Sequence, residues 1–535
     1  MEKRAFNLLD EPWILAEDRR GEAVKLSLPE VFARAHELKA LSGDMPAQDI
    51  AILRLLLGVL YAVYTRTDAY NEARDESDTK RILKLWKELW DAGRFEEGII
   101  GTYLRGYEDR FWLVHPTHPF WQIAGLKNGT EGTAAKLIGN LSESNNKLRL
   151  FQGRSGRAKD ALDYDEAARW LIHLNGFDDA SAKPSVRKSG MPSVGPGWLG
   201  KLGIVFAMGN TLFETLLLNL VLLDHNENPW DDGVAAWETD PPRTGERTQI
   251  PLPDNQIELL TLQSRRVLLK VEDDRIKGFI ALGGDFFSEE NAFSEQMTLW
   301  KWAKGEKGAQ NFYKPKRHNP AKQFWRDFSS IFAANEGDRL PGIIHWLSRL
   351  EYHNKIVSRH VKIQALSVQY AGAQRSAVED AWEDSISVHA KLLSKLGDAW
   401  IVDVTKNLKI TDAMVACLGD LASDIAAASG ISDGRSKSAP AKEEAYFRLD
   451  MPFRGWLAGI NPEKDPMDDT CKEWIDTVRD ILLSFGEELI QQAGVHAFIG
   501  REVKKKGKRN LYTAPTAHAK FRGRIHKLIK TEGYS

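Results

Sequence analysis

Two histidines lie three positions apart in the stretch His115-Pro-Thr-His-Pro119. Imidazole nitrogens are common zinc ligands, so this pair invites a metal interpretation. Each histidine precedes a proline, however, which disfavours the helix that would align the two rings, and we find no third ligand nearby. The chain has only two cysteines, Cys417 and Cys471, too few for a thiolate zinc site or a disulfide framework. We therefore expect no metal and no cofactor.

Motifs of known catalytic sites are absent from the sequence. It has no Walker A loop, no His-Glu-x-x-His, no Gly-x-Ser-x-Gly and no paired His-Asp nuclease motif. The acids Asp285, Glu289 and Glu290 follow two glycines and are typical of a solvated loop. We expect a protein that is not an enzyme. The alternative is a DNA-processing enzyme, such as a nuclease, whose carboxylates or histidines converge only in three dimensions.

Three loops combine basic residues with glycines and aromatic side chains, over residues 147–159, 188–200 and 300–320. Glycines let a backbone approach a partner closely, and basic, amide and aromatic side chains contact phosphates and groove edges. In isolation each loop also has an ordinary structural interpretation: a surface turn that packs Trp198 onto the core, or a flexible polar loop. Together, in a chain of net charge −2, they favour a localised nucleic-acid surface.

The elements that hold these loops follow from apolar spacing. Residues 48–65 are apolar on most faces, which indicates a buried helix. Residues 265–271 and 277–282 are predicted to be strands, with Asp273-Asp274 in the turn between them.

Beyond Ile356 the pattern changes to long helical segments with few strand signals. We expect helices joined by short connections, which form a bundle. The predicted helices cover about 375–396, 412–429, 441–458, 469–493 and 517–530. The predicted fold class is α+β, with a mixed α/β N-terminal domain over residues 1–360 and a helical bundle over residues 361–535.

The length of 535 residues exceeds what one core supports, which agrees with more than one domain. No uninterrupted apolar run reaches the roughly 18 residues that a membrane span needs, and the first residues do not resemble a signal peptide. We expect a cytoplasmic protein without a membrane partner.

Six motifs, in their order and spacing, resemble the large subunit CasA of the type I-E CRISPR Cascade complex. The resemblance runs from end to end of the chain. The motifs are Phe6-Asn-Leu-Leu-Asp-Glu-Pro-Trp-Ile14, His115-Pro-Thr-His-Pro-Phe-Trp-Gln122, Gly209-Asn-Thr-Leu-Phe-Glu-Thr-Leu-Leu-Leu-Asn-Leu220, His318-Asn-Pro320, Tyr370-Ala-Gly-Ala-Gln-Arg-Ser376 and Phe447-Arg448.

This resemblance implies a mixed α/β N-terminal domain, a C-terminal four-helix bundle and no catalytic activity. It implies a subunit that recognises the protospacer-adjacent motif in double-stranded DNA from the minor groove. Strand separation would follow, so that guide RNA pairs with the target strand in an R-loop. The implied partners are the other Cascade subunits, guide RNA, double-stranded target DNA and a recruited helicase-nuclease.

Carried over position by position, the resemblance assigns DNA contacts to seven residues. They are Phe151, Gln152, Gly190, Lys304, Lys307, Gln374 and Arg375. In the family's pattern Gln152 contacts base edges, Gln374 is a wedge that splits the first base pair, and a lysine enters the groove. That lysine is either Lys304 or Lys307. This chain lacks the cysteine pairs that some members carry, which agrees with the expected absence of zinc.

Overall fold

The computed structural model describes residues 4–66, 79–96, 98–143, 153–180, 195–239, 248–305, 308–335, 337–353, 355–356, 360–371, 378–431, 433–505 and 508–534. The chain forms two compact units. Unit 1 comprises residues 1–320, 337–350 and 362–385, and unit 2 comprises residues 321–336, 351–361 and 386–535. Residue 360, where the sequence analysis places a domain boundary, is the first residue of strand β14 (His360–Tyr370), and the two units alternate along the chain on both sides of it.

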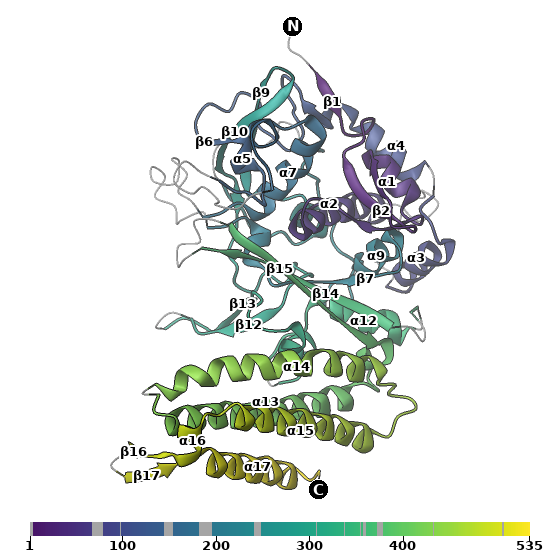
Figure 1. The fold of residues 1–535 in the computed structure, drawn as a ribbon. Coiled ribbons are helices and arrows are strands. Elements are labelled where there is room, and N and C mark those ends of the chain that lie inside the picture. Colours follow the sequence, from purple (N-terminus) through teal and green to yellow (C-terminus); the bar gives the residue numbers. More distant parts are fainter. Residues whose placement is uncertain are drawn as a thin grey trace. The chain divides into compact units, whose positions relative to one another are not determined.

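Small sheets, rather than one large sheet, provide the strands of unit 1 (Figure 1). Three sheets have three strands in the orders β3-β2-β4, β6-β10-β9 and β15-β14-β7, and the pairs β1-β5, β11-β8 and β12-β13 stand alone. The strands are β1 (Ala5–Asn7), β2 (Ile14–Asp18), β3 (Ala23–Leu26), β4 (Leu38–Leu41), β5 (Trp112–Val114), β6 (Thr130–Thr133), β7 (Ile204–Met208), β8 (Thr248–Gln249), β9 (Arg265–Glu272), β10 (Arg275–Gly283), β11 (Asp285–Phe286), β12 (Trp300–Ala303), β13 (Phe312–Pro315), β14 and β15 (Val378–His389).

The helices of unit 1 are α1 (Leu28–Arg34), α2 (Pro46–Tyr64), α3 (Thr79–Ala92), α4 (Ile99–Gly106), α5 (Ala134–Leu137), α6 (Arg157–Asp160), α7 (Tyr164–Phe177), α9 (Leu212–Asn219), α10 (Gln256–Leu260) and α12 (Gly342–Tyr352). Helix α2 lies in the core of the unit and packs against α4, α7, α9 and α10. Nearly every side chain of α2 is buried, which confirms the predicted buried helix. By length and composition α2 could also cross a membrane, but 94% of its apolar window is buried inside the protein, as in the core helix of a soluble protein.

The hairpin of β9 and β10 confirms the predicted strand pair. Asp273 and Asp274 join the strands, and their φ angles are +52° and +58°. Consecutive left-handed residues are typical of the tight turns that match the twist of a hairpin, and aspartate tolerates this conformation better than most residues. The local sequence therefore predicts the two strands and their turn correctly.

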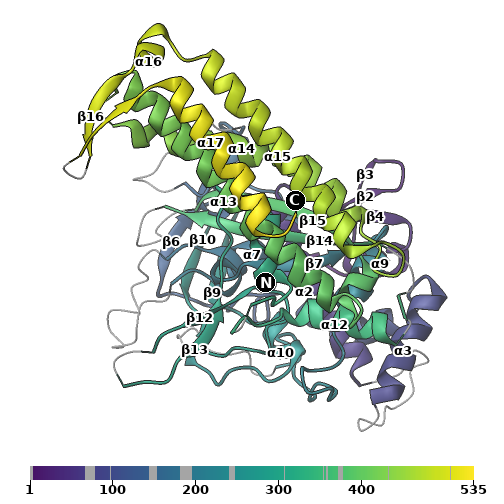
Figure 2. The ribbon, with the colours of Figure 1, turned by 90° about the horizontal axis from the view of Figure 1, so that it is seen from below.

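Unit 2 is dominated by a four-helix bundle, as predicted. Its long helices are α13 (Asp398–Ala428), α14 (Ser438–Gly459), α15 (Met467–Gln491) and α17 (Ala514–Thr531). Helix α13 packs against each of the other three, and Figure 2 shows the four running side by side. The remaining elements are α11 (Phe328–Ile331), α16 (Val495–Ile499), β16 (Arg501–Lys505) and β17 (Lys508–Tyr512). Buried side chains such as Leu418, Phe453, Trp474 and Phe521 fill the bundle core.

One predicted element is wrong. A helix was expected over about residues 375–396, whereas residues 378–389 form strand β15, which pairs with β14. Good helix formers such as Glu379, Ala381 and Glu383 favour the helix locally. The strand forms instead because it pairs with β14 in a three-stranded sheet, and this pairing overrides the weak local propensity.

Candidate nucleic-acid interface

The hairpin of β12 and β13 carries the described part of the third basic loop. Trp302 lies opposite Tyr313, and Lys301 lies opposite Lys314. Trp302 is 53% exposed, and its ring contacts that of Tyr313 with the ring centroids 4.5 Å apart. The cross-strand pair of lysines places two positive charges on one part of the hairpin. The exposed indole offers a surface on which a base can stack.

Lys304 directly follows β12, and its side chain is exposed. The next residue is Gly305, where a Cβ would lie 2.3 Å from the carbonyl oxygen of Gln310, so that only glycine fits this position. The amide of Gly305 also donates to Oδ1 of Asn311 at 3.3 Å. Lys304 therefore lies directly before a close backbone contact. Lys307, the other candidate for the groove-entering lysine, lies outside the described residues.

The glycine-rich loop is described over residues 195–200, and Gly190 lies outside this part. A Cβ at Gly197 would lie 2.3 Å from the carbonyl oxygen of Gly176 at the end of α7, so the two backbones are in direct contact. Trp198 is 5% exposed, which confirms that it packs onto the core. The end of the loop is thus seated on unit 1.

A buried ion pair holds Trp198 in place. The indole Nε1 donates to Oε2 of Glu295 at 2.8 Å. Glu295 also accepts hydrogen bonds from both terminal nitrogens of Arg54 on α2, each at 2.8 Å. The side chains of Arg54 and Glu295 are 3% and 1% exposed. Removing one partner of such a pair costs about 3–5 kcal/mol, so this anchor fixes the loop end firmly.

A second buried ion pair holds the backbone just before it. Nε of Arg265 donates to Oδ2 of Asp178 at 2.6 Å, and Nη2 donates to the carbonyl oxygen of Gly195 at 2.8 Å. The consecutive arginines at the start of an apolar strand are the signal that the sequence analysis missed. Buried arginines require acceptors, and here the acceptors are Asp178 and the loop backbone.

Tyr370 connects the glycine-rich loop to the segment that contains Gln374 and Arg375, two predicted residues outside the described part of the chain. Its hydroxyl donates to the carbonyl oxygen of Phe177 at 2.8 Å. Burial raises the pKa of this hydroxyl well above its ordinary value, so it stays protonated as a donor. A Cβ at Gly200 would lie 2.1 Å from Oη of Tyr370. The two segments therefore meet at this contact.

Lys136 on α5 connects the starts of two loops. Its Nζ donates to Oγ of Ser142 at 3.3 Å and forms an ion pair with Asp179, whose side chain is 1% exposed. Ser142 lies shortly before the segment that holds Phe151 and Gln152, which the structure does not describe. Asp179 lies shortly before the glycine-rich loop.

The flanks of the predicted DNA-contacting segments thus lie together in unit 1. The amide of Leu299, next to β12, donates to the carbonyl oxygen of Gly203 at 3.0 Å. Arg317, just after β13, donates to the carbonyl oxygen of Val368 and lies over the ring of Tyr370 at 5.1 Å. These contacts hold the basic hairpin, the end of the glycine-rich loop and the end of β14 next to one another.

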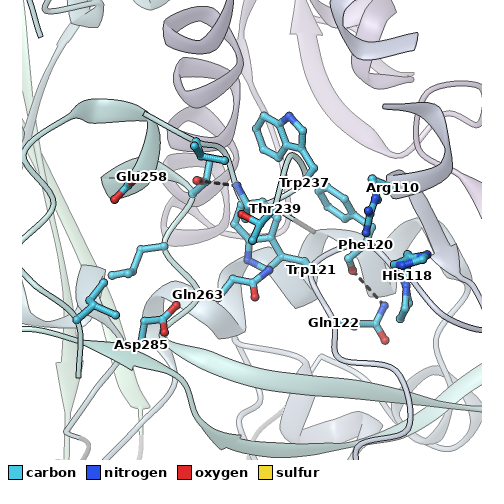
Figure 3. Close-up of a pocket in the computed structure, with 16 residues that line it drawn as sticks. Arg110, His118, Phe120, Trp121, Gln122, Trp237, Thr239, Glu258, Gln263 and Asp285 are labelled. Atoms are coloured by element: carbon cyan, nitrogen blue, oxygen red, sulfur yellow. Dashed lines mark hydrogen bonds between the residues drawn. The ribbon is translucent and has the colours of Figure 1, made fainter. Parts of the chain in front are cut away.

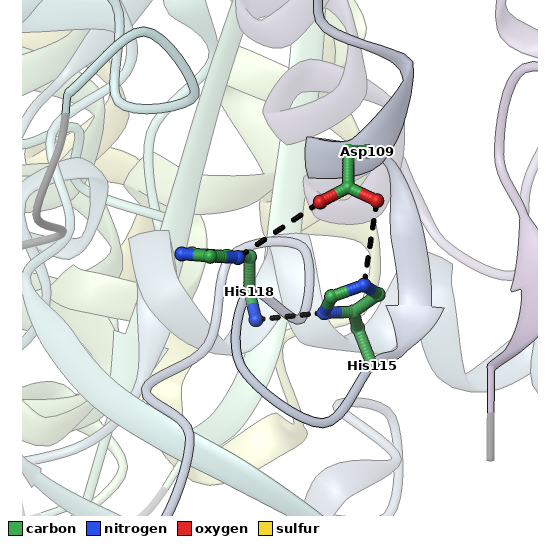
Figure 4. A group of neighbouring side chains, drawn as sticks. All are labelled: Asp109, His115 and His118. Atoms are coloured by element: carbon green, nitrogen blue, oxygen red, sulfur yellow. Dashed lines mark hydrogen bonds and ion pairs between the residues drawn. The ribbon is translucent and has the colours of Figure 1, made fainter. Parts of the chain in front are cut away.

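The two histidines of the sequence analysis do meet a third polar residue, Asp109 (Figure 4). His115 Nε2 lies 3.5 Å from one carboxylate oxygen of Asp109, and His118 Nδ1 lies 3.9 Å from the other. The backbone amide of His118 donates to Nδ1 of His115 at 2.8 Å, which assigns the proton of the neutral ring to Nε2. Burial lowers the pKa of His115, favouring this neutral form.

A metal does not fit this tautomer. A histidine that binds a metal through Nε2 usually donates its other N–H to an acceptor, whereas Nδ1 of His115 faces a backbone donor. Instead, the N–H at Nε2 of His115 points toward the carboxylate of Asp109. Asp109 also pairs with Arg4 at 3.1 Å.

A small cavity of about 70 Å³ lies beside His118 (Figure 3). The rings of Trp121 and Trp237 line it, with their centroids 6.2 Å apart. Asp285 lines it too, and here the expectation of a solvated loop is wrong. Asp285 is 4% exposed and accepts a hydrogen bond from the buried Arg266 at 2.6 Å. Because its charge is matched by a fixed guanidinium, Asp285 is a structural partner in the core.

The fold described above, an α+β unit and a four-helix bundle, is shared with solved structures of CRISPR-associated Cse1 proteins. The sequence model of the family described as CRISPR-associated protein Cse1 matches residues 7–485. The chain therefore belongs to the CRISPR-associated Cse1 family.

Individual relatives agree with this assignment. The chain is 30% identical over 337 residues to the CRISPR-associated protein CasA/Cse1 of Thermus thermophilus, a match that covers 62% of this chain and 61% of the relative. The structure of Thermobifida fusca Cse1 has a TM-score of 0.81 at 28% identity and covers 98% of both chains. That of Cse1 from Acidimicrobium ferrooxidans has a TM-score of 0.79 at 24% identity and covers 99% of both chains, which shows the same fold.

Proposed function

We propose that the chain is the large, non-catalytic subunit of a type I-E RNA-guided antiviral surveillance complex, acting in the cytoplasm. It would recognise the protospacer-adjacent motif in double-stranded DNA from the minor groove and begin strand separation. Its partners would be the other Cascade subunits, guide RNA, the target duplex and a recruited helicase-nuclease. Membership of the Cse1 family supports this role. The observation that carries it is the set of contacts that joins the flanks of the basic hairpin, the end of the glycine-rich loop and Tyr370.

Motif reading would use short-range contacts in a narrow groove. The proposed contacts are the amide of Gln152, the backbone near Gly190 and the ammonium group of Lys304 or Lys307. Lys304 is exposed and directly precedes the close contact between Gly305 and Gln310, which suits a side chain that must enter a groove. The minor groove distinguishes A·T from G·C pairs and little more, so the motif read there should be short and tolerant. Guide pairing would supply the remaining sequence specificity.

Strand separation would depend on Gln374 and its neighbour Arg375. Unstacking a base step costs a few kcal/mol, and a side chain that occupies the gap offsets part of this cost. Such a wedge needs a rigid support in the protein. Tyr370 supplies one, because its hydroxyl is bonded to Phe177 and its ring is wedged against Gly200.

The test is the Gln374→Ala variant in the reconstituted complex with guide RNA and a target duplex. We expect initial binding to the motif to persist. R-loop formation, measured by the permanganate reactivity of unpaired thymines, should slow at least about tenfold. Gln249→Ala, an exposed glutamine on β8, is the matched control and should leave the rate unchanged. Equal rates of R-loop formation for wild type and Gln374→Ala would refute the wedge assignment.

The non-catalytic part of the proposal has its own test. Among the described residues, Asp109, His115 and His118 form the one group of three or more potential ligands close enough to share an ion, and their tautomer does not suit a metal. This favours a binding role over a metal-dependent nuclease. Labelled duplex incubated with the chain and Mg²⁺ or Mn²⁺ should stay intact without the helicase-nuclease. Cleavage by the chain alone would support the alternative, a DNA-processing enzyme.

A further inference from the structure

A second cavity of unit 1, of about 360 Å³, has no part in the proposed DNA contacts. Its lining comes from the loop between β4 and α2 and from α9, β7, β14 and β15. Figure 1 shows α9 beside β7, as their packing requires. The volume is at the lower end of the range for small-molecule sites. The cavity shares no residue with the segments assigned to DNA.

The walls are largely apolar. Met45, Phe206 and Met208 are partly exposed there, and Leu212 and Leu366 are buried behind them. Thioether and aromatic surfaces adapt well to flexible aliphatic chains, because methionine has several rotatable bonds and no fixed shape. Such walls suit a ligand with a methylene stem.

Two carboxylates without a basic partner and one amide oxygen without a donor gather at the same cavity. Asp49, in the first turn of α2, accepts the amide of Gly43 at 2.7 Å through Oδ1. Nε2 of Gln364 donates to Glu383 at 3.2 Å, whereas Oε1 of Gln364 is buried and has no donor. Within the described part of the chain, no lysine, arginine or histidine pairs with Asp49 or Glu383. The lining contains no basic side chain.

The neighbouring carboxylate of Asp44 has the basic partners that Asp49 and Glu383 lack. Asp44 also lines the cavity, but Arg154 lies 3.1 Å from it and Arg169 lies 3.5 Å from it. Its charge is therefore compensated by the protein itself. Asp49 is partly buried, and a partly buried carboxylate beside an amide oxygen without a donor is unfavourable unless a donor-rich group completes them. Ammonium and guanidinium groups carry donors only, so they match this set.

We propose that this cavity binds an alkyl cation, that is, a primary ammonium or guanidinium group on an aliphatic stem. The charged head would lie between Asp49, Gln364 and Glu383, and the stem would lie against Phe206 and Met208. This is the way lysine and arginine stems cover apolar surface while their heads find polar partners. The same chemistry is presented by a free polyamine and by a lysine or arginine side chain of a partner protein.

Proton linkage gives the proposal a signature. Burial raises the pKa of Asp49 to about 7, the carboxylates of Asp44 and Glu383 add to this rise, and Arg169 opposes it. A bound cation favours the ionised carboxylate, so it binds more tightly where Asp49 has lost its proton. With a pKa of about 7, affinity should be about tenfold higher at pH 8 than at pH 6.

The experiment is titration calorimetry of the purified full-length chain with pentylammonium and, as its neutral counterpart, pentan-1-ol. We expect the ammonium to bind at least about tenfold more tightly, because charge-assisted hydrogen bonds are about twice as strong as neutral ones. Glu383→Gln should weaken ammonium binding by a similar factor. Asp380→Asn, an exposed acid on the same strand outside the cavity, should not change it.

Further ligands distinguish the sources. Tighter binding of butane-1,4-diamine than of N-acetyl-lysine methylamide supports a free polyamine, and the reverse order, or binding of the arginine analogue, supports a partner side chain. Equal affinity for pentylammonium and pentan-1-ol would overturn the proposal. So would the absence of pentylammonium binding, or pentylammonium binding by Glu383→Gln as tight as by the wild type. Glu383 is exposed, so its variant should fold even if Asp49→Asn does not. DNA binding is measured separately, so neither proposal depends on the other.

Discussion

Replacing Gly200 by alanine tests whether Gly200 and Tyr370, beneath the proposed interface, pack as closely as the structure indicates. The added Cβ would lie 2.1 Å from Oη of Tyr370, and contacts of real Cβ atoms essentially never fall below 3.0 Å. The hydroxyl must therefore move by about 0.9 Å, from 2.1 Å to 3.0 Å. Its 2.8 Å hydrogen bond to the carbonyl oxygen of Phe177 has no room for this shift. A strained contact and a lost buried hydrogen bond follow.

Each of these two effects costs about 1–3 kcal/mol, so we expect Gly200→Ala to lower the free energy of unfolding of unit 1 by about 2–6 kcal/mol. Hydrogen exchange of amides in α7 and β14 measures this loss locally. Gly101→Ala is the control, since a Cβ there meets open space and alanine favours a helix.

A double variant isolates the contact. Tyr370→Phe removes the atom that collides, and the nearest ring atom then lies 2.9 Å from the new Cβ. Gly200→Ala should therefore cost at least about 1 kcal/mol less in the Tyr370→Phe background than in the wild type. A cost below about 0.5 kcal/mol for Gly200→Ala in the wild type, or strict additivity of the two changes, would refute this reasoning.

Other predictions follow from the same structure. Glu295→Gln leaves the buried Arg54 without its counter-charge and should cost about 3–5 kcal/mol in urea unfolding, whereas a cost within about 0.5 kcal/mol would show that the pair is not a structural anchor. Asp49 has a folded-state pKa of about 7, above its ordinary 3.8, so its contribution to stability declines as the pH rises between these values. Asp49→Asn should therefore be more stable than wild type at pH 8 and not at pH 4, and an equal effect at both would contradict the assignment. Lys304→Ala in the reconstituted complex should reduce the slope of log affinity against log salt by about 0.9 if its ammonium contacts one phosphate, and an unchanged slope would remove it from the interface.

Sequence patterns predicted the helices and turns that are determined by residues close together in the chain. The apolar run of α2 indicated a buried helix, and Asp273-Asp274 indicated the tight turn of the β9–β10 hairpin. The bundle helices were predicted because long segments with short connections leave few alternative arrangements. Strand β15 was missed because its sequence is compatible with a helix, and its partner β14 decides the outcome.

The residues that support the candidate interface could not be found from spacing. Arg54 and Glu295 are separated by 241 positions in the sequence, and no short motif marks such a pair. Asp109 was missed for a related reason, because the turn of the chain, rather than a regular helix, brings it to the histidines. Asp285 was mistaken for a solvated acid because burial beside Arg266 is a property of packing.

The central claim is that this chain reads a short DNA motif for an RNA-guided complex. The most direct measurement is the affinity of the reconstituted complex for a target duplex that carries the motif, compared with a duplex whose motif alone is scrambled. We expect the scrambled duplex to bind at least about tenfold more weakly, since one mismatched base pair in a recognised site costs about 1–3 kcal/mol. Equal affinity for the two duplexes, with guide pairing intact, would contradict the claim.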